Sequence, residues 1–373
     1  MSDPEVVVVG GGPAGTCAAI AAAMAGARVM LVDRARFPRD KVCGCCLSEA
    51  AVAGLGSIGA SHVLHDAVPI GAVRLVSGTR EARLSRAGGA SLSRRALDAR
   101  LVAHAADRGV TVVEGASARV HPDGSVTVGP GTADSLRPAC TVIADGLGGG
   151  ALDDRPDFGW TIEPRNRIGI GAVLPAGSLE CPPGEIRMHV ARAGYMGAVQ
   201  LEDGSIDVAA AVRPDALRDA GGPAACARAW LGSAVRNAAA IDAARWRGTP
   251  ALTRRRTRVA APRVLVAGDA AGYVEPFTGE GMGWAIATGS AAGRLAADMR
   301  HAPDAWRAWP GRHRDLVRAQ RLRCRTIALA LRSPLLVHGA IAVATAAPRA
   351  LGAVARSIGH RIPSPPRATG ASA

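Results

Sequence analysis

Glycines near the start of the chain have the spacing of a dinucleotide-binding turn. Gly10, Gly12 and Gly15 stand between a run of valines and a small-residue pattern typical of a helix. In such a turn the first glycine makes the bend, the second lets the backbone approach a pyrophosphate, and the third allows the helix to pack closely on the strand. Asp33 ends the next strand pattern, where a carboxylate can accept hydrogen bonds from ribose hydroxyls. The segment predicts a dinucleotide site rather than a glycine-rich turn without a ligand.

A second motif, later in the chain, favours FAD over NAD. Residues 264–283 read VLVAGDAAGYVEPFTGEGMG, a buried strand followed by Gly-Asp and a glycine-rich helix start. The Asp269 carboxylate can bind the ribityl hydroxyls of a flavin, and N–H groups at the helix start can face the pyrimidine edge of its ring. That edge gains negative charge on reduction, which the helix dipole would stabilise. The alternative is an ordinary strand–turn–helix connection in which Asp269 caps the helix.

Together these motifs resemble the geranylgeranyl reductase family of FAD-dependent oxidoreductases, part of the para-hydroxybenzoate hydroxylase-like superfamily. The resemblance covers residues 5–46, 92–120 and 262–300 and includes KVCGCCLS at 41–48 and RRALDARL at 94–101. It implies that FAD does the chemistry, with NAD(P)H or another external donor reducing it. From the motifs and the resemblance together, the residues predicted to bind FAD are Gly10, Gly12, Ala14, Gly15, Asp33, Arg34, Cys43, Gly44, Cys46, Arg94, Asp269, Gly279, Gly281 and Met282.

Three residues are predicted to be catalytic: Cys43, Cys46 and Tyr195. The two cysteines could form a redox dithiol, provide half of a metal site, or line a pocket as small side chains. In the resembled family a cysteine of this loop lines the isoalloxazine pocket, which favours the last interpretation. Lys41 would lower the pKa of a thiol beside it. Tyr195 is included because residues 194–204 resemble the family's cap strand, without the Trp and Pro of its Tyr-x-Trp-x-Phe-Pro motif.

Patterns along the chain predict an α/β fold. A discontinuous Rossmann-like FAD-binding domain is expected, with an inserted antiparallel sheet as the substrate domain and a helical C-terminus. After about residue 150 the pattern changes to short strands with turns, including Ile168–Leu174, Glu185–Val190 and Ile206–Val212. The expected divisions are 1–150 and 260–300 for FAD binding, 151–259 for the cap, to which 60–90 could contribute, 301–360 for C-terminal helices, and a disordered tail at 361–373.

Composition limits the partners and the location of the protein. The 45 Lys and Arg against 31 Asp and Glu give a net charge of +14, which suits phosphorylated ligands or anionic lipid headgroups. Aromatic residues make up 3%, too few for base-stacking platforms, so no nucleic-acid partner is expected. The eight cysteines are scattered and lack zinc spacing, so reduced thiols and no metal are expected.

No targeting segment is evident, so a cytoplasmic protein is expected. The apolar stretch Leu335–Ala347 is too short and too interrupted to span a bilayer. It is expected either to pack on the core or to make peripheral contact with the inner face of a membrane. The oligomeric state is not predicted.

The leading hypothesis for the reaction is reduction or dehydrogenation of a carbon–carbon bond in a hydrophobic, isoprenoid-like or lipid molecule. A second hypothesis is a flavin monooxygenase that hydroxylates or epoxidises an apolar or aromatic substrate. A third, from another class, is a non-catalytic, flavin-bound electron carrier. None of the motifs decides between nicotinamide and oxygen as the second substrate.

Overall fold

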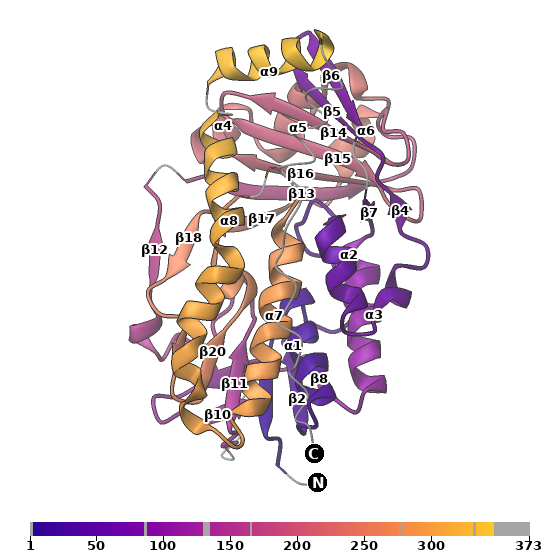
Figure 1. Cartoon of the computed structure of the whole chain (residues 1–373). Helices are drawn as coiled ribbons and strands as arrows, with labels where there is room; N and C mark the ends of the chain where they lie inside the picture. The colour runs from indigo at the N-terminus through magenta and orange to yellow at the C-terminus, as the bar shows by residue number, and fades with distance from the viewer. Residues whose placement is uncertain are drawn as a thin grey trace.

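A mostly parallel sheet forms the lower half of the molecule as drawn in Figure 1. The structure is a computed structural model that describes residues 3–85, 88–129, 135–164, 166–275, 277, 279–330 and 333–346. The strands lie in the order β19-β20-β11-β1-β2-β8, and only β19 pairs antiparallel. They are β1 (Val6–Val9), β2 (Val29–Asp33), β8 (Thr111–Glu114), β11 (Cys140–Ile143), β19 (Ala260–Ala261) and β20 (Val264–Val266). The four valines of β1 are all buried, as expected for a central parallel strand.

Helices α1 (Pro13–Met24), α3 (Arg94–Asp107) and α7 (Gly281–Asp298) pack beside this sheet, with α1 in contact with the other two. Two glycines of α7 let its backbone touch that of α1. A Cβ on Gly289 would lie 2.0 Å from the Ala14 oxygen, and a Cβ on Gly293 would lie 2.1 Å from the Ala18 oxygen. The two helices therefore run parallel, and α7 begins about two turns before α1 does, beyond the upper end of the parallel sheet.

A second, larger sheet lies above the first (Figure 1). Its order is β17-β13-β16-β15-β14-β5-β6, antiparallel except between β14 and β5. The strands are β5 (Ala72–Ser77), β6 (Arg80–Ser85), β13 (Ile168–Leu174), β14 (Glu185–Ala191), β15 (Gly194–Gln200), β16 (Ile206–Val212) and β17 (Arg247–Ala251). Apolar side chains of β13, β15 and β16 pack against α5 (Pro223–Leu231) and α6 (Ala238–Ala243) on one face, which leaves the other face toward the parallel sheet.

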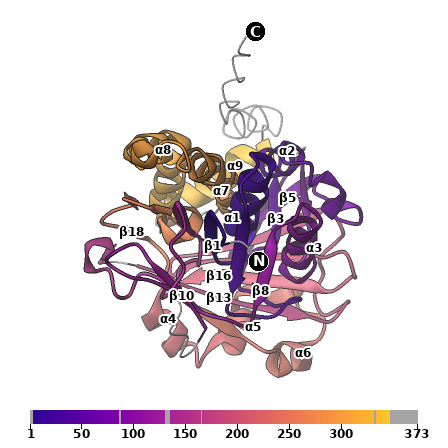
Figure 2. The ribbon, with the colours of Figure 1, turned by 90° about the horizontal axis from the view of Figure 1, so that it is seen from below.

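The remaining elements connect and flank the two sheets. Figure 2 shows α8 (Trp309–Ala330) and α9 (Pro334–Ala346) on one flank and α4 (Pro214–Asp219), α5 and α6 on the other. α9 packs on β6 and β5. The other elements are α2 (Glu49–Gly56), β3 (Cys46–Ser48), β4 (Val68–Pro69), β7 (Gly89–Ser91), β9 (Ala118–Val120), β10 (Val126–Val128), β12 (Trp160–Ile162), β18 (Arg254–Arg256) and β21 (Gly272–Tyr273).

The expected α/β class, with a parallel sheet and a helical C-terminus, is confirmed. The tail predicted to be disordered at 361–373 and the end of the predicted helical region, 347–360, lie outside the described residues. Among the residues that the structure describes, no helix is both long and apolar enough to cross a bilayer. Nor do His, Cys, Asp and Glu side chains there form a group that could hold a metal ion.

Candidate active site

A cavity of about 1490 Å³ lies between the two sheets. One wall comes from the glycine turn before α1, the loop 38–46, the start of α3, the turn at Asp269 and the start of α7. The opposite wall comes from β14, β15 and β16 of the second sheet. Ordinary ligand pockets measure roughly 300–1,000 Å³, so this cavity has room for a dinucleotide and a second molecule.

The glycine turn presents an anion-binding surface to this cavity. Gly10 has φ +106°, and a Cβ there would lie 2.4 Å from the Ala144 oxygen, so only glycine fits. A Cβ on Gly15 would lie 1.7 Å from the Gly10 oxygen, which places Gly15 in the helix–strand contact rather than on the cavity wall. Gly12 instead faces the guanidinium groups of Arg94 and Arg39, at 3.5 and 3.7 Å from its notional Cβ. The start of α1 and two cations thus meet at one point, a suitable place for a pyrophosphate.

Asp33 ends β2 at the edge of the cavity. Its carboxylate accepts hydrogen bonds from the backbone N–H of Gly11 at 2.6 Å and of Ala35 at 2.8 Å, and it lies 3.4 Å from the Arg39 guanidinium. A carboxylate has about four lone-pair sites, so capacity remains for ribose hydroxyls. Arg34 also borders the cavity and donates to the Gly148 carbonyl at 3.4 Å.

Arg94 begins α3 and organises the cysteine side of the site. Its guanidinium donates two hydrogen bonds, of 2.9 and 2.8 Å, to the completely buried carboxylate of Asp98. The neighbouring Cys45 thiol and the Arg94 guanidinium lower the pKa of Cys43 to about 5, against the opposing effect of burial. Lys41, which the sequence suggested as the cation beside a thiol, is not among the groups that lower this pKa; Arg94 takes that role.

The structure brings Cys43 together with Cys45. The Cys43 and Cys45 thiols interact electrostatically, and Cys45 adopts φ +50°, a backbone conformation that favours glycine. Cys46 starts β3, and its Cβ lies 3.4 Å from the position that a Cβ on Gly279 would occupy. All four residues from Cys43 to Cys46 border the cavity. The catalytic role of Cys43 and Cys46, as residues that line the flavin pocket, stays a prediction.

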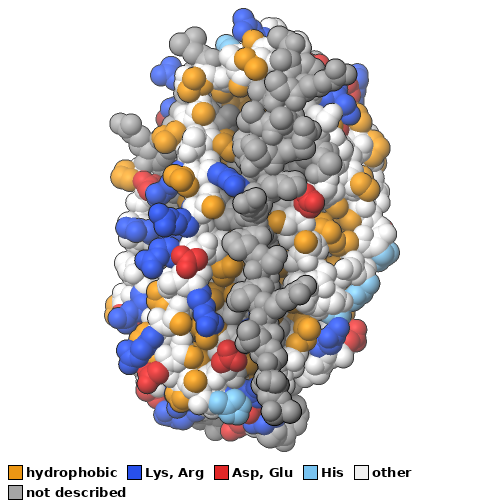
Figure 3. Space-filling view, viewed as in Figure 1, with side chains coloured by type: hydrophobic (Ala, Val, Ile, Leu, Met, Phe, Trp, Pro, Cys, Tyr) orange, Lys and Arg blue, Asp and Glu red, His pale blue; other side chains and the backbone are white. Residues whose placement is uncertain are grey.

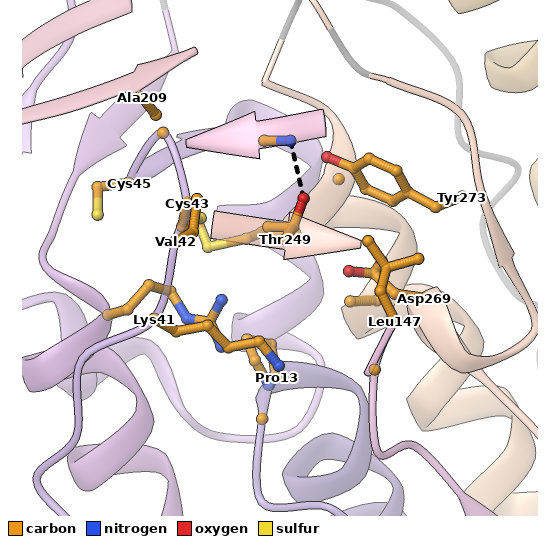
Figure 4. A pocket seen from close by; sticks show the side chains of 18 of the residues that line it. Pro13, Lys41, Val42, Cys43, Cys45, Leu147, Ala209, Thr249, Asp269 and Tyr273 are labelled. Carbon is orange, nitrogen blue, oxygen red and sulfur yellow. Dashed lines mark hydrogen bonds between the residues drawn. The ribbon is translucent and has the colours of Figure 1, made fainter. Parts of the chain in front are cut away.

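Asp269 faces this loop from the opposite side of the hollow (Figure 4). Burial raises the pKa of its carboxyl to about 6, while Lys41 and Arg94 pull it down. Lys41 is the only lysine of the chain and lines the cavity, where desolvation and the nearby Arg94 and Arg39 lower the pKa of its ammonium. Tyr273 points into the same space as Asp269 (Figure 4). Gly279, Gly281 and Met282 also border the cavity, next to the start of α7, whereas Pro276 and Thr278 of the same motif lie outside the described residues.

Tyr195 lies on β15, in the wall formed by the second sheet. Its buried ring meets the edge of Phe277, with centroids 5.0 Å apart, and the Arg167 guanidinium lies 5.9 Å from its centroid. Arg167 in turn forms a buried ion pair with Glu275. Burial raises the pKa of the Tyr195 hydroxyl well above its usual value. The ring is therefore fixed by aromatic and cationic neighbours at the edge of the cavity.

Asp207 borders the same cavity and was not among the predicted site residues. It lies in β16, its side chain is buried, and it interacts with the Cys45 thiol. The signal in the sequence is one acidic residue inside the apolar strand IDVAAAV. An unpaired carboxylate in such a strand is costly, which makes it a candidate for function.

Comparison with known proteins identifies the family. A model of the family described as FAD dependent oxidoreductase matches residues 5–61. The chain is 31% identical over 347 residues to menaquinone reductase of Mycobacterium tuberculosis, covering 82% of this chain and 78% of that protein. The chain belongs to the FAD-dependent oxidoreductase family. Menaquinone reductase of Mycolicibacterium smegmatis is 29% identical to this FAD-dependent oxidoreductase over 342 residues, covering 82% and 79%.

Solved structures share the fold of this FAD-dependent oxidoreductase. A flavin-dependent brominase superposes with a TM-score of 0.79 at 18% identity, covering 96% of this chain and 94% of the other. A geranylgeranyl bacteriochlorophyll reductase-like protein from Thermoplasma acidophilum gives 0.71 at 18% identity, covering 96% and 92%. Identities this low establish the architecture and leave the reaction open.

The residues around the cavity fit FAD. Gly12 faces two guanidinium groups, Gly44 has open space where a Cβ would be, and the half-buried Asp269 is available as a charged acceptor. These groups lie along one wall of a cavity large enough for the dinucleotide. FAD, when bound, supplies the redox chemistry of its isoalloxazine ring.

Asp269→Ala is expected to weaken FAD binding by about 1–3 kcal/mol, because ribityl hydroxyls would lose a charged acceptor. The pKa of about 6 adds a pH dependence. Only the ionised carboxylate is a pure acceptor, so wild-type affinity should fall as pH drops through about 6. Fluorescence titration of apoprotein with FAD between pH 5 and 8, roughly, measures both effects.

Asp269→Asn is the matched variant, since it keeps the size and one acceptor oxygen of the side chain. Its FAD affinity should lie between those of the wild type and Asp269→Ala, and neither variant should show the wild-type loss near pH 6. Equal affinity in all three proteins would place the ribityl chain away from Asp269.

Proposed function

We propose that this protein reduces a carbon–carbon double bond in a hydrophobic, isoprenoid-like substrate, in the manner of a geranylgeranyl reductase. The observation that carries the proposal is the apolar wall opposite the proposed flavin site. Ile186 and Met188 of β14 and Val199 of β15 border the cavity there, beside small residues of β16. The kinship with menaquinone reductases supports a substrate with an isoprenoid part.

FAD would occupy the wall formed by the parallel sheet. Gly12, Arg39 and Arg94 would hold the pyrophosphate, because the helix start and two guanidinium groups meet there. Asp33 would bind the adenosine ribose and Asp269 the ribityl chain. The second sheet, with β5 and β6 at its far edge, would then serve as the substrate cap and keep water away from the reacting carbon. NAD(P)H or another external donor would reduce the flavin.

The C-terminal helices would bring a lipid substrate from a membrane surface. Leu322 and Leu329 of α8 and Leu336 and Val343 of α9 are exposed apolar side chains. Ile327, between the first two, borders the cavity. Lys and Arg side chains gather on the left of the face in Figure 3, over α8 and the neighbouring strands. The exposed arginines of α8 are Arg312, Arg314, Arg318 and Arg325. Such a basic and apolar surface suits an anionic bilayer.

The mass of the product tests the reaction. Holoenzyme reduced with dithionite, given menaquinone in anionic vesicles without oxygen, should yield a product heavier by two hydrogens in the side chain. An unchanged side chain under these conditions would contradict the proposal. A product that gains one oxygen atom when air is admitted would identify a monooxygenase instead.

A further inference from the structure

Cys43, Cys45 and Asp207 bring three acidic groups together on the cap side of the cavity. Cys43 and Cys45 belong to the loop before β3, and Asp207 belongs to β16, far away in sequence. The Cys45 thiol interacts electrostatically with Cys43 on one side and with Asp207 on the other. All three side chains border the cavity. Figure 4 shows the two cysteines, with Ala209 of β16 next to the loop.

The pKa shifts of Cys43, Cys45 and Asp207 place the negative charge of this group of three at Cys43. The neighbouring Cys45 thiol and the Arg94 guanidinium lower the pKa of Cys43 to about 5, which favours a thiolate at that sulfur. The interaction with Cys43, together with burial, raises the pKa of Cys45. Burial, together with the negative charge of Cys43, raises the pKa of Asp207 well above its usual value. These directions favour a single negative charge, on Cys43, with protons on Cys45 and Asp207.

The residues paired with Asp207 on the adjacent strands carry no charge. Its strand neighbours are Val173 on β13 and Val199 on β15, and neither is ionisable. Among the described residues, its Oδ2 is buried and has no hydrogen-bond partner. An ionised carboxylate would be left unpaired there, whereas a protonated carboxyl can donate its O–H to the Cys45 sulfur or to a molecule in the cavity.

The backbone of Cys45 is a second, independent observation. Its φ of +50° belongs to the left-handed region, where glycine is comfortable and cysteine is strained. Strained residues of this kind cluster where their side chains have a function. Here the strain coincides with the only thiol of the loop that contacts Asp207.

We propose that Asp207 is the acid that protonates the substrate carbon and that Cys45 is a positioning residue that orients it. The inference rests on the proposed function, since reduction of a double bond adds one hydride and one proton. In this step the O–H bond of Asp207 breaks, and its electron pair stays on the carboxylate oxygen. The π electrons of the double bond form a C–H bond with the proton, and the hydride supplied by reduced flavin completes the second carbon. The carboxylate then regains a proton from water.

The first test does not depend on turnover. Infrared spectra of apoprotein at about pH 7 should contain the carbonyl band of a protonated carboxylic acid, and this band should disappear in Asp207→Asn. Subtraction of the two spectra removes the contribution of other buried carboxyls. Cys45→Ala should retain the band at a shifted frequency, because it removes the thiol that interacts with Asp207. Absence of the difference band would overturn the proposal.

The second test uses reduced holoenzyme and menaquinone in anionic vesicles. Asp207→Asn should slow side-chain reduction by about 10²- to 10⁴-fold, the usual contribution of a general acid, with unchanged FAD affinity. Asp203→Asn is the matched control. Asp203 lies in the exposed turn between β15 and β16, and this variant should react like the wild type. Should Asp207→Asn fold poorly, Asp207→Leu provides an apolar replacement of similar size with the same expected loss.

The outcomes separate the two proposals. A rate for Asp207→Asn within about threefold of the wild type would exclude Asp207 as the acid. Wild-type protein that carries the infrared band but leaves the menaquinone side chain unreduced would overturn the proposed function, and with it the catalytic role, while confirming the protonated carboxyl.

Discussion

Arg94→Met is expected to destabilise the protein by about 3–5 kcal/mol and to abolish tight FAD binding. The change leaves Asp98 completely buried, with Arg39, at 3.5 Å, still forming an ion pair with it. It also removes one of the two guanidinium groups that face Gly12. Urea unfolding of apoprotein measures the first effect, and flavin content after purification measures the second.

Arg100→Met is the matched control on the same helix. Arg100 forms a two-point ion pair with Asp66, at 2.6 and 2.8 Å, but this pair is partly exposed and does not border the cavity. Such pairs contribute about 0–1 kcal/mol, so this variant should remain stable and yellow. Equal losses of stability in the two variants would show that the burial of Asp98 has no special importance.

Arg94→Met should also change the absorbance of the Cys43 thiol, because Arg94 interacts with Cys43. Because the guanidinium of Arg94 helps to hold the pKa of Cys43 near 5, Arg94→Met should raise that pKa. The absorbance of the thiolate would then appear at a higher pH than in the wild type. This shift reports the contact directly, whereas a loss of stability alone does not.

Local features of the chain were predictable. The valines of β1, the glycines after them and Asp33 lie within one short segment, so spacing alone placed the strand, turn and carboxylate correctly relative to one another. The predicted strands Ile168–Leu174 and Ile206–Val212 coincide with β13 and β16. In each case residues close together in the sequence determine which side chains are buried and at what spacing apolar residues recur. Both can be seen in the sequence.

Contacts across the fold were not predictable in the same way. CxxC spacing drew attention to Cys43 and Cys46, but the positive φ of Cys45 turns a different thiol toward Cys43. Proximity in sequence suggested Lys41 as the cation, but α3 delivers Arg94 from a distant part of the chain. Asp207 reaches the loop only because β16 is stacked above it, a consequence of how two sheets pack.

The packing of α7 on α1 is another long-range feature, and it positions the proposed flavin site. Gly289 and Gly293 lie one turn apart on α7 and face the backbone of α1. This contact fixes where α7 begins relative to α1, and hence where Gly281 and Met282 border the cavity. Backbone atoms cannot rotate aside as a flexible side chain can, so added volume here must separate the helices.

Gly293→Ala is therefore expected to destabilise the protein by about 1–3 kcal/mol, near the upper end of that range, and to weaken FAD binding as well. Its new methyl group would otherwise lie 2.1 Å from the Ala18 oxygen.

Gly311→Ala in α8 is the matched control, since nothing lies within 4 Å of its notional Cβ. There the better helix former and the stiffer unfolded chain should stabilise by about 0.4–1 kcal/mol. Urea unfolding and FAD titration of both variants should give changes in stability of opposite sign, with lowered FAD affinity only in Gly293→Ala. If both substitutions stabilise the protein, the close approach of α7 to α1 is not what fixes the start of α7 at the cavity.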